Sequence, residues 1–135
     1  MAQLNPYAQY NNVTFETASP VGLVVTSYEN AVRGLKEAQR AIRDKDYASR
    51  TRNIDLAFGL ISELRKSLNP EKGGEVADKL NALYEFFQRE IVTANATNDA
   101  DRLKPVIDMM SDLHQAWDEA SRKLRQEDAA ASFSA

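Results

Sequence analysis

The only histidine of the chain, His114, is the first candidate for chemistry, because Asp108 and Asp112 lie shortly before it. A histidine near carboxylates could ligate a metal ion. Helical bundles that hold two irons, however, present inward carboxylates and two Glu-x-x-His pairs, and this sequence contains no such pair. We therefore predict no metal site and expect His114 to be a solvated or boundary residue.

Other residue types that support catalysis are also poorly placed. The chain has no cysteine, which excludes thiolate zinc sites and cysteine nucleophiles. Gly73 and Gly74 are not followed by the lysine and hydroxyl residue of a phosphate-binding loop, so we expect them to form a turn. The apolar stripes described next contain no acid, base or nucleophile pair. We predict that the protein is not an enzyme and needs no cofactor.

The stretch that organises the chain runs from Pro20 to about Asp44. Ser19 is a favourable N-cap, and Pro20 suits the first helical position, where no N–H donor is needed. Apolar residues then recur at alternating spacings of three and four, which is the pattern of one face of an α-helix. These residues are Val21, Val24, Tyr28, Ala31, Leu35, Ala38 and Ile42. A stripe of this length needs partner helices.

Three later segments supply such partners, each with its own apolar stripe. The second helix is expected to end at Asn69-Pro70, because the residue before a proline disfavours helical conformation. The fourth is expected to start near Asp99 with a local bend at Pro105. The stripes are Ile54, Ala57, Ile61, Leu64 and Leu68; Val76, Leu80, Leu83, Phe87 and Ala94, with Tyr84 and Ile91 beside them; and Leu103, Val106, Met110, Leu113, Trp117, Ala120 and Leu124.

These segments predict an all-α fold, an antiparallel four-helix bundle of residues 17–126. A chain of 135 residues has the length of a single domain and can bury an adequate hydrophobic core. We expect Trp117 to lie in this core. Residues 1–16 have no sustained period but contain aromatic rings, so we expect an N-terminal arm or short helix that docks on the bundle. Residues 127–135 are expected to form a flexible C-terminal tail.

The charge and hydropathy of the chain argue against two classes of partner. The net charge is −3 and no stretch concentrates the positive field that nucleic acids require, so no nucleic-acid binding is expected. No apolar run approaches the roughly 20 residues that span a bilayer, and the N-terminal residues do not resemble a signal peptide. We therefore expect a cytoplasmic protein without membrane insertion.

A basic stripe follows the first helix. We interpret it as a solvated face paired with nearby carboxylates, and a docking face for acidic partners is the alternative. The stripe consists of Arg33, Lys36, Arg40 and Arg43.

Apolar residues that lie off the stripes predict where a partner binds. Together they could line a groove wide enough for an amphipathic helix. The candidates are Leu23, Leu56, Leu60, Phe86 and Met109, together with Tyr7 and Tyr10 of the arm. We hypothesise that the rings of the arm, with Phe15, cover this groove in the free protein and move aside for the partner. An arm that also contacts the bound segment is the alternative.

Short motifs in a fixed order make the chain similar to a known family from Asn5 to about Ala120. Each motif is short, but their order and spacing are together specific. They are Asn5-Pro6-Tyr7-x-x-Tyr10, Thr17-Ala18-Ser19-Pro20-x-x-Leu23, Tyr28-Glu29-Asn30-Ala31, Ile61-x-Glu63-Leu64, Leu83-Tyr84-Glu85-Phe86, Ala94-Asn95-x-x-Asn98-Asp99 and Ala116-Trp117. In these features the chain resembles the flagellar secretion chaperones of the FliS type. It departs from them at Ser27, where a bulky apolar residue is frequent, and at Pro105, where an acidic residue is common.

The resemblance implies a small helical protein that binds the C-terminal region of flagellin in the cytoplasm. Such a chaperone prevents premature filament polymerisation and helps to deliver flagellin to the flagellar type III export apparatus. A surplus of apolar residues without a catalytic constellation agrees with this role. The alternative is a structural or signalling bundle that self-associates, for instance as a homodimer, through the same surface.

Overall fold

Four long α-helices and one 3₁₀ turn make up the described structure. The computed structural model describes the backbone of residues 20–134 and the side chains of residues 20–131. The elements are α2 (Pro20–Asp44), α3 (Tyr47–Lys66), α4 (Pro70–Thr97), η1 (Ala100–Arg102) and α5 (Leu103–Ser134). No strand occurs within residues 20–134. The all-α prediction is confirmed, whereas the N-cap Ser19 and the arm lie outside the described residues.

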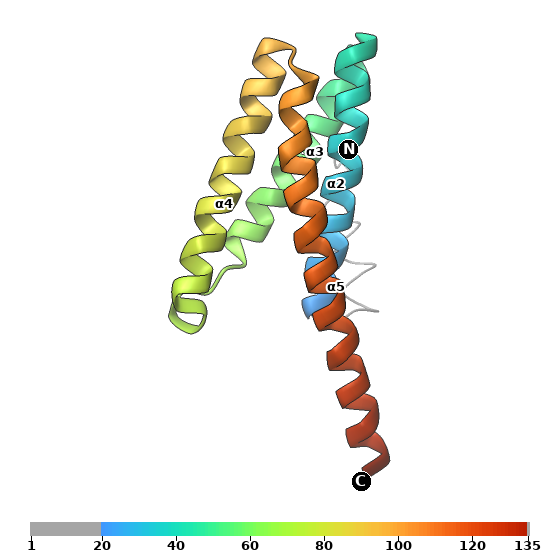
Figure 1. Cartoon of the computed structure of the whole chain (residues 1–135), viewed down its shortest axis with the longest axis vertical. Coiled ribbons are helices and arrows are strands. Elements are labelled where there is room, and N and C mark those ends of the chain that lie inside the picture. The colour runs from blue at the N-terminus through green and yellow to red at the C-terminus, as the bar shows by residue number, and fades with distance from the viewer. Residues whose placement is uncertain (1–19, 135) are drawn as a thin grey trace, which may run out of the picture.

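Consecutive helices run in opposite directions, as an antiparallel bundle requires (Figure 1). Helix α2 packs against both α3 and α5, and α4 packs mainly against α3 and η1. In Figure 1, α4 and α5 approach each other near their connection and diverge toward the lower end, where α5 extends beyond the other helices. Among the described residues, no helix combines the length and apolarity needed to cross a membrane.

The core follows the predicted stripes. Because burying a large apolar side chain contributes about 1.5–3 kcal/mol, these stripes supply most of the driving force for folding. The largest fully buried side chains are Tyr28, Tyr84, Phe87, Leu35, Ile61, Ile91, Leu103, Met110 and Val106. Of these, Tyr84 and Ile91 were expected only beside a stripe.

Several stripe residues are less buried than the sequence predicts. Val76 is 65% exposed and Leu124 is 43% exposed. Leu124 lies in the part of α5 that follows the last buried residue, Ser121, so no neighbouring helix covers it. The prediction that Trp117 lies within the core is also corrected, since its indole is half-buried and packs against the core from outside.

The connection between α3 and α4 differs from the expected turn. Helix α3 ends at Lys66, and Asn69 caps α4 by accepting hydrogen bonds from the backbone N–H groups of Glu71 (3.1 Å) and Lys72 (3.2 Å). The predicted turn at Gly73-Gly74 therefore lies inside α4. There Gly74 has φ 50° and ψ −124° and kinks the helix, a conformation that glycine adopts without a steric penalty.

The last helix starts and ends elsewhere than predicted. Asp99 caps η1 and α5 begins at Leu103, so Pro105 lies in the first turn of α5 and interrupts no hydrogen bond of its interior. The expected bend is thus replaced by a junction between a 3₁₀ turn and an α-helix. Helix α5 continues to Ser134, and the flexible tail expected over residues 127–135 stays a prediction.

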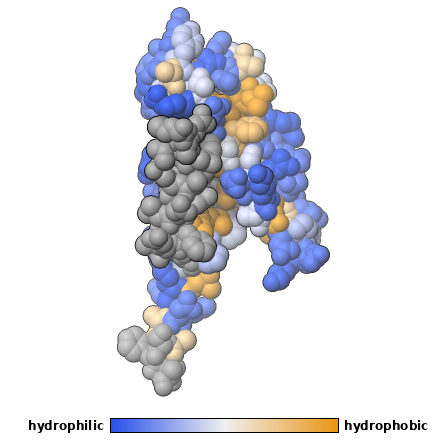
Figure 2. Space-filling view, turned by 180° about the vertical axis from the view of Figure 1, so that it is seen from behind, coloured by the Kyte–Doolittle hydropathy of each residue, from blue (hydrophilic) through white to orange (hydrophobic). Residues whose placement is uncertain are grey.

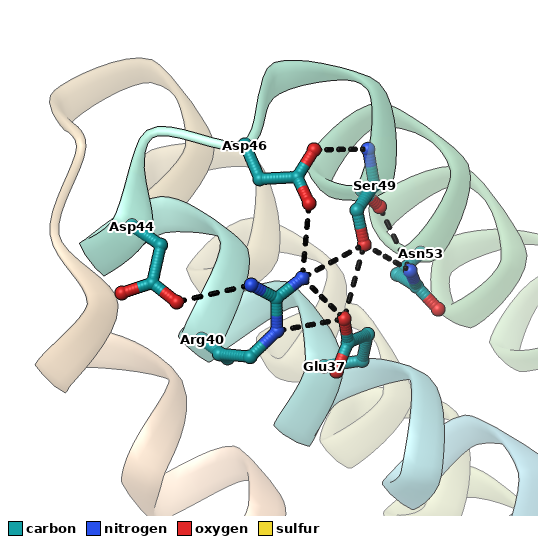
Figure 3. A network of polar contacts seen from close by, with 6 residues as sticks. All are labelled: Glu37, Arg40, Asp44, Asp46, Ser49 and Asn53. Atoms are coloured by element: carbon teal, nitrogen blue, oxygen red, sulfur yellow. Dashed lines mark hydrogen bonds and ion pairs between the residues drawn. The ribbon is translucent and has the colours of Figure 1, made fainter.

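Two polar networks hold the helix ends at the α2–α3 turn. In the first, Arg40 donates to Glu37 (Nε to Oε1, 2.8 Å), Asp44 (3.0 Å) and Asp46 (3.1 Å), and Asp46 also caps α3 by accepting from Ser49 N–H at 3.2 Å (Figure 3). Hydrogen bonds from Arg40 hold the pKa of Glu37 and of Asp46 below their usual values.

The second network explains why asparagines recur at the end of α4. Arg50 donates to the side-chain oxygens of Asn95 (2.7 Å) and Asn98 (2.5 Å) and to the backbone carbonyl of Asn95. Asn98 has φ 55° and ends α4 in the left-handed conformation that asparagine tolerates. The guanidinium thus joins the start of α3 to the end of α4.

Candidate partner-binding site

The predicted groove residues of α3 face α2. A Cβ placed on Gly34 of α2 would lie 3.7 Å from Leu56 Cδ2, which shows that the half-buried Leu56 packs beside α2. Leu60 is only 3% exposed and belongs to the core. Its predicted position off the core is therefore wrong, because the apolar face of α3 is wide enough to contact both α2 and α4.

Phe86 of α4 and Met109 of α5 both retain exposed surface. Phe86 is half-buried, with its ring centroid 6.1 Å from that of Phe87. One turn later, Glu90 pairs with Arg102 of η1 at 2.9 Å, so this face of α4 turns toward the η1–α5 segment. Met109 on α5 is 39% exposed. Partner binding by Phe86, Met109 and Leu56 in one groove stays a prediction.

The remaining candidates lie at or beyond the start of α2. Leu23 is half-buried in the first turns of α2. Tyr7 and Tyr10 fall outside the described residues, and so does the proposed covering arm.

The structure shows a different apolar groove, between α3 and α4. It is a depression of about 440 Å³, in which Phe58 is 37% exposed and Val92 is 55% exposed. We call it the Phe58–Val92 groove, and its lining is Phe58, Arg65, Glu85, Gln88, Arg89, Val92 and Thr93. In the view from behind, hydrophobic surface is visible between the hydrophilic flanks of the molecule (Figure 2).

The polar groups beneath this groove satisfy one another. Gln88, which is 7% exposed, donates to the backbone carbonyl of Phe58 at 3.2 Å and to Ser62 Oγ at 2.8 Å. Arg65 donates to Gln88 Oε1 at 3.0 Å and pairs with Glu85 at 2.8 Å. Because these groups already have partners, an apolar ligand can cover them without leaving these hydrogen bonds unmade.

A positively charged side chain lies at the edge of the groove. Arg89 is exposed, and within the described residues no carboxylate pairs with its guanidinium. An apolar strip with a charge at its rim matches one face of an amphipathic helix that carries a carboxylate. The sequence pattern did not single out Phe58 or Val92 as groove residues, although each directly follows another apolar residue, Ala57 or Ile91.

The basic stripe of α2 is mostly neutralised. Arg33 pairs with Glu29 at 3.2 Å, and Arg43 pairs with Asp101 at 2.9 Å. Arg40 is held by the three carboxylates of the turn network. This pairing supports the interpretation of the stripe as a solvated face.

The buried titratable side chains, Tyr28 and Tyr84, are part of the packed core. The hydroxyls of Tyr28 and Tyr84 lie 2.5 Å apart, and their ring centroids are separated by 6.3 Å. Burial raises the pKa of both tyrosines, so both stay protonated at neutral pH. Among the described residues, no cluster of His, Cys, Asp or Glu could hold a metal ion.

Comparison with known proteins identifies the family. A family model described as "Flagellar protein FliS" matches residues 3–124. The flagellar secretion chaperone FliS of Bacillus subtilis (strain 168) is 30% identical over 127 residues, which cover 94% of this chain and 94% of that protein. The protein of the same name from Campylobacter jejuni subsp. jejuni serotype O:6 is 36% identical over 115 residues, covering 85% of this chain and 88% of that protein.

A solved structure agrees with the fold. The structure described as "Crystal structure of flagellar chaperone from bacteria" superimposes with a TM-score of 0.71 at 17% identity, and the match covers 87% of this chain and 95% of that one. The helical bundle, the ordered motifs and the match over residues 3–124 point to the same family. The chain belongs to the FliS family of flagellar proteins.

Proposed function

We propose that this protein is a flagellin export chaperone. It binds the C-terminal region of flagellin in the cytoplasm, prevents premature polymerisation and assists delivery to the flagellar type III export apparatus. The names of its relatives, flagellar secretion chaperones, support this role. The observation that carries it is the exposed pair Phe58 and Val92 beside the hydrogen-bonded network of Gln88 and Arg65.

Binding takes the form of helix-in-groove recognition. An apolar face of the flagellin segment covers Phe58 and Val92, and a carboxylate of the segment pairs with Arg89. The other candidates, Leu23, Leu56, Phe86 and Met109, do not line this groove. They take part only if the segment continues around the bundle.

Serine substitutions on α4 test this proposal with a matched control. Val92→Ser removes apolar contact area from the groove, whereas Val76→Ser makes the same chemical change at another exposed site, near the start of α4 (65% exposed against 55% for Val92). Phe58→Ser and Val92→Ser should each weaken binding of the C-terminal segment of the cognate flagellin by about tenfold, equivalent to about 1.4 kcal/mol. Val76→Ser should leave the affinity unchanged. Equal affinities for the two valine variants would count against the groove.

The arm has its own test. If residues 1–14 only cover a binding surface, their deletion should raise flagellin affinity and promote aggregation, because covering residues compete with the ligand. If Tyr7 and Tyr10 also contact flagellin, the deletion should weaken binding. Unchanged affinity together with unchanged solubility would refute both versions.

The alternative function, a self-associating bundle, is tested by the oligomeric state of the free protein. Sedimentation of the free protein should show a monomer. A tight homodimer that Phe58→Ser disrupts would favour the alternative of a self-associating bundle.

A further inference from the structure

A second depression lies where the α2–α3 turn meets the connection from α4 to η1, at the upper end of the view in Figure 1. Its volume is about 490 Å³, and it shares no lining residue with the Phe58–Val92 groove. We call it the end pocket. It is lined by Ile42, Arg43, Lys45, Tyr47, Arg50, Asn98 and Ala100.

The walls of the end pocket carry three positive charges and little compensation. Arg50 donates only to neutral amide and carbonyl oxygens, so its charge is not cancelled. Within the described residues, Lys45 pairs with no carboxylate. Arg43 pairs with Asp101, but the side chain of Asp101 is 90% exposed, and such solvated pairs are weak.

The turn network keeps the neighbouring carboxylates away from the pocket. Asp44 and Asp46 flank Lys45 in the sequence and could neutralise it. Figure 3 shows both of them directed at Arg40, at 3.0 and 3.1 Å, and Asp46 also caps α3. The network therefore leaves the lysine available to a ligand.

The remaining surfaces of the pocket suit a peptide. Ile42 and Ala100 are 6% and 7% exposed and contribute an apolar base, whereas Tyr47 is 65% exposed and offers an aromatic face. The amide of Ser49 in the first turn of α3 is already taken by Asp46, so it cannot contribute to a phosphate cradle. Charges spread around a space of this size match several carboxylates along a chain better than one compact anion.

We infer that the end pocket binds an acidic peptide segment of a partner protein, whose carboxylates pair with Arg43, Lys45 and Arg50 while Tyr47 packs against its side chains. This site is additional to the apolar groove. Because the whole chain carries a net charge of −3, binding of a polyanion needs a local concentration of cations, which these three side chains supply.

The test uses a hexaglutamate peptide as probe and the full chain as target. Amide NMR spectra at low salt should show shifts confined to residues around Lys45, Tyr47 and Asn98, and added salt should weaken the binding because the charges are exposed. The double variant Arg43→Gln/Lys45→Gln should reduce the affinity by about fivefold or more. Glutamine at position 45 meets the same left-handed backbone as lysine, so Lys45→Gln alone serves as a milder second variant.

The control variant removes the same charge elsewhere. Lys123→Gln/Arg125→Gln changes two exposed cations of α5 and should leave the affinity for hexaglutamate unchanged. The inference is overturned if the two double variants weaken binding equally, or if a hexaglutamine peptide binds as well as hexaglutamate. It is also overturned if inorganic phosphate produces the same shifts at the same concentration, since the pocket would then be a simple anion site.

Discussion

At the scale of single residues, the most informative contact is the hydroxyl pair of Tyr28 and Tyr84. The sequence places Tyr28 on the stripe of α2, but Tyr84 was expected only at the edge of the α4 stripe. Both are buried, at 0% and 2% exposure, because their hydroxyls satisfy each other inside an apolar core. Such a pairing depends on how α2 and α4 lie in space, which the periodicity of either helix alone does not specify.

Loss of either hydroxyl tests this pair. Tyr28→Phe and Tyr84→Phe each leave the hydroxyl of the other tyrosine without its buried partner, so each should cost about 1–3 kcal/mol of unfolding free energy. Urea denaturation of both variants measures the losses. An unchanged unfolding free energy for both variants would contradict a buried hydroxyl pair.

The same pair predicts a loss of stability in alkali. Burial raises the pKa of both tyrosines above the ordinary value of 10.0 that applies to the unfolded chain. Below pH 10.0 both tyrosines are protonated in the folded and in the unfolded chain, so their contribution to stability is fully present. Above it the unfolded chain releases protons that the fold retains, so stability falls by up to about 1.4 kcal/mol per pH unit for each tyrosine.

A double variant isolates this contribution from other groups that titrate in alkali. Tyr28→Phe/Tyr84→Phe lacks both phenols, so its unfolding free energy should fall less steeply than that of the original protein above pH 10.0. Urea denaturation across this range measures both slopes. Parallel slopes would show that the buried phenols do not titrate as described.

At the scale of elements, periodicity predicted the helices well and their ends less well. The start at Pro20 and the end at Asp44 match α2, because cap chemistry and apolar spacing are local properties. The end of α3 and the junction before α5 were misplaced, since Asn69 caps the following helix and Asp99 starts a 3₁₀ turn. A polar residue between two helices can end the first helix or cap the second, and the local sequence does not decide which.

Two glycines test the packing of these elements. A Cβ on Gly34 would meet Asn53 O at 3.5 Å and Leu56 Cδ2 at 3.7 Å, both ordinary contacts, so Gly34→Ala should stabilise the protein by about 0.5–1 kcal/mol. A Cβ on Gly73 would lie 2.8 Å from Ala77 Cβ, so Gly73→Ala should not stabilise it. Thermal unfolding compares the two. A loss of stability for Gly34→Ala would mean that α2 and α3 pack more closely than described.

At the scale of the whole molecule, the partner-binding surface stays a prediction, and the structure shows how its candidate residues are buried. Off-stripe apolar residues indicated such a surface, but Leu60 proved to be core, whereas Leu56 packs beside α2 and Phe86 packs beside Phe87. The exposed pair Phe58 and Val92 comes from two helices, and its exposure depends on the angle between α3 and α4. The end pocket was not predicted either, because its cations Arg43, Lys45 and Arg50 meet Asn98 and Ala100 only in the folded chain.

The most direct test of the central claim is calorimetric titration of this protein with the C-terminal segment of its cognate flagellin at several temperatures. We predict one-to-one binding with a negative heat-capacity change, because apolar faces of the segment and of the bundle leave water. Circular dichroism of the same sample must show the helical fold. A folded protein that takes up no flagellin segment would contradict the assignment as a flagellin chaperone.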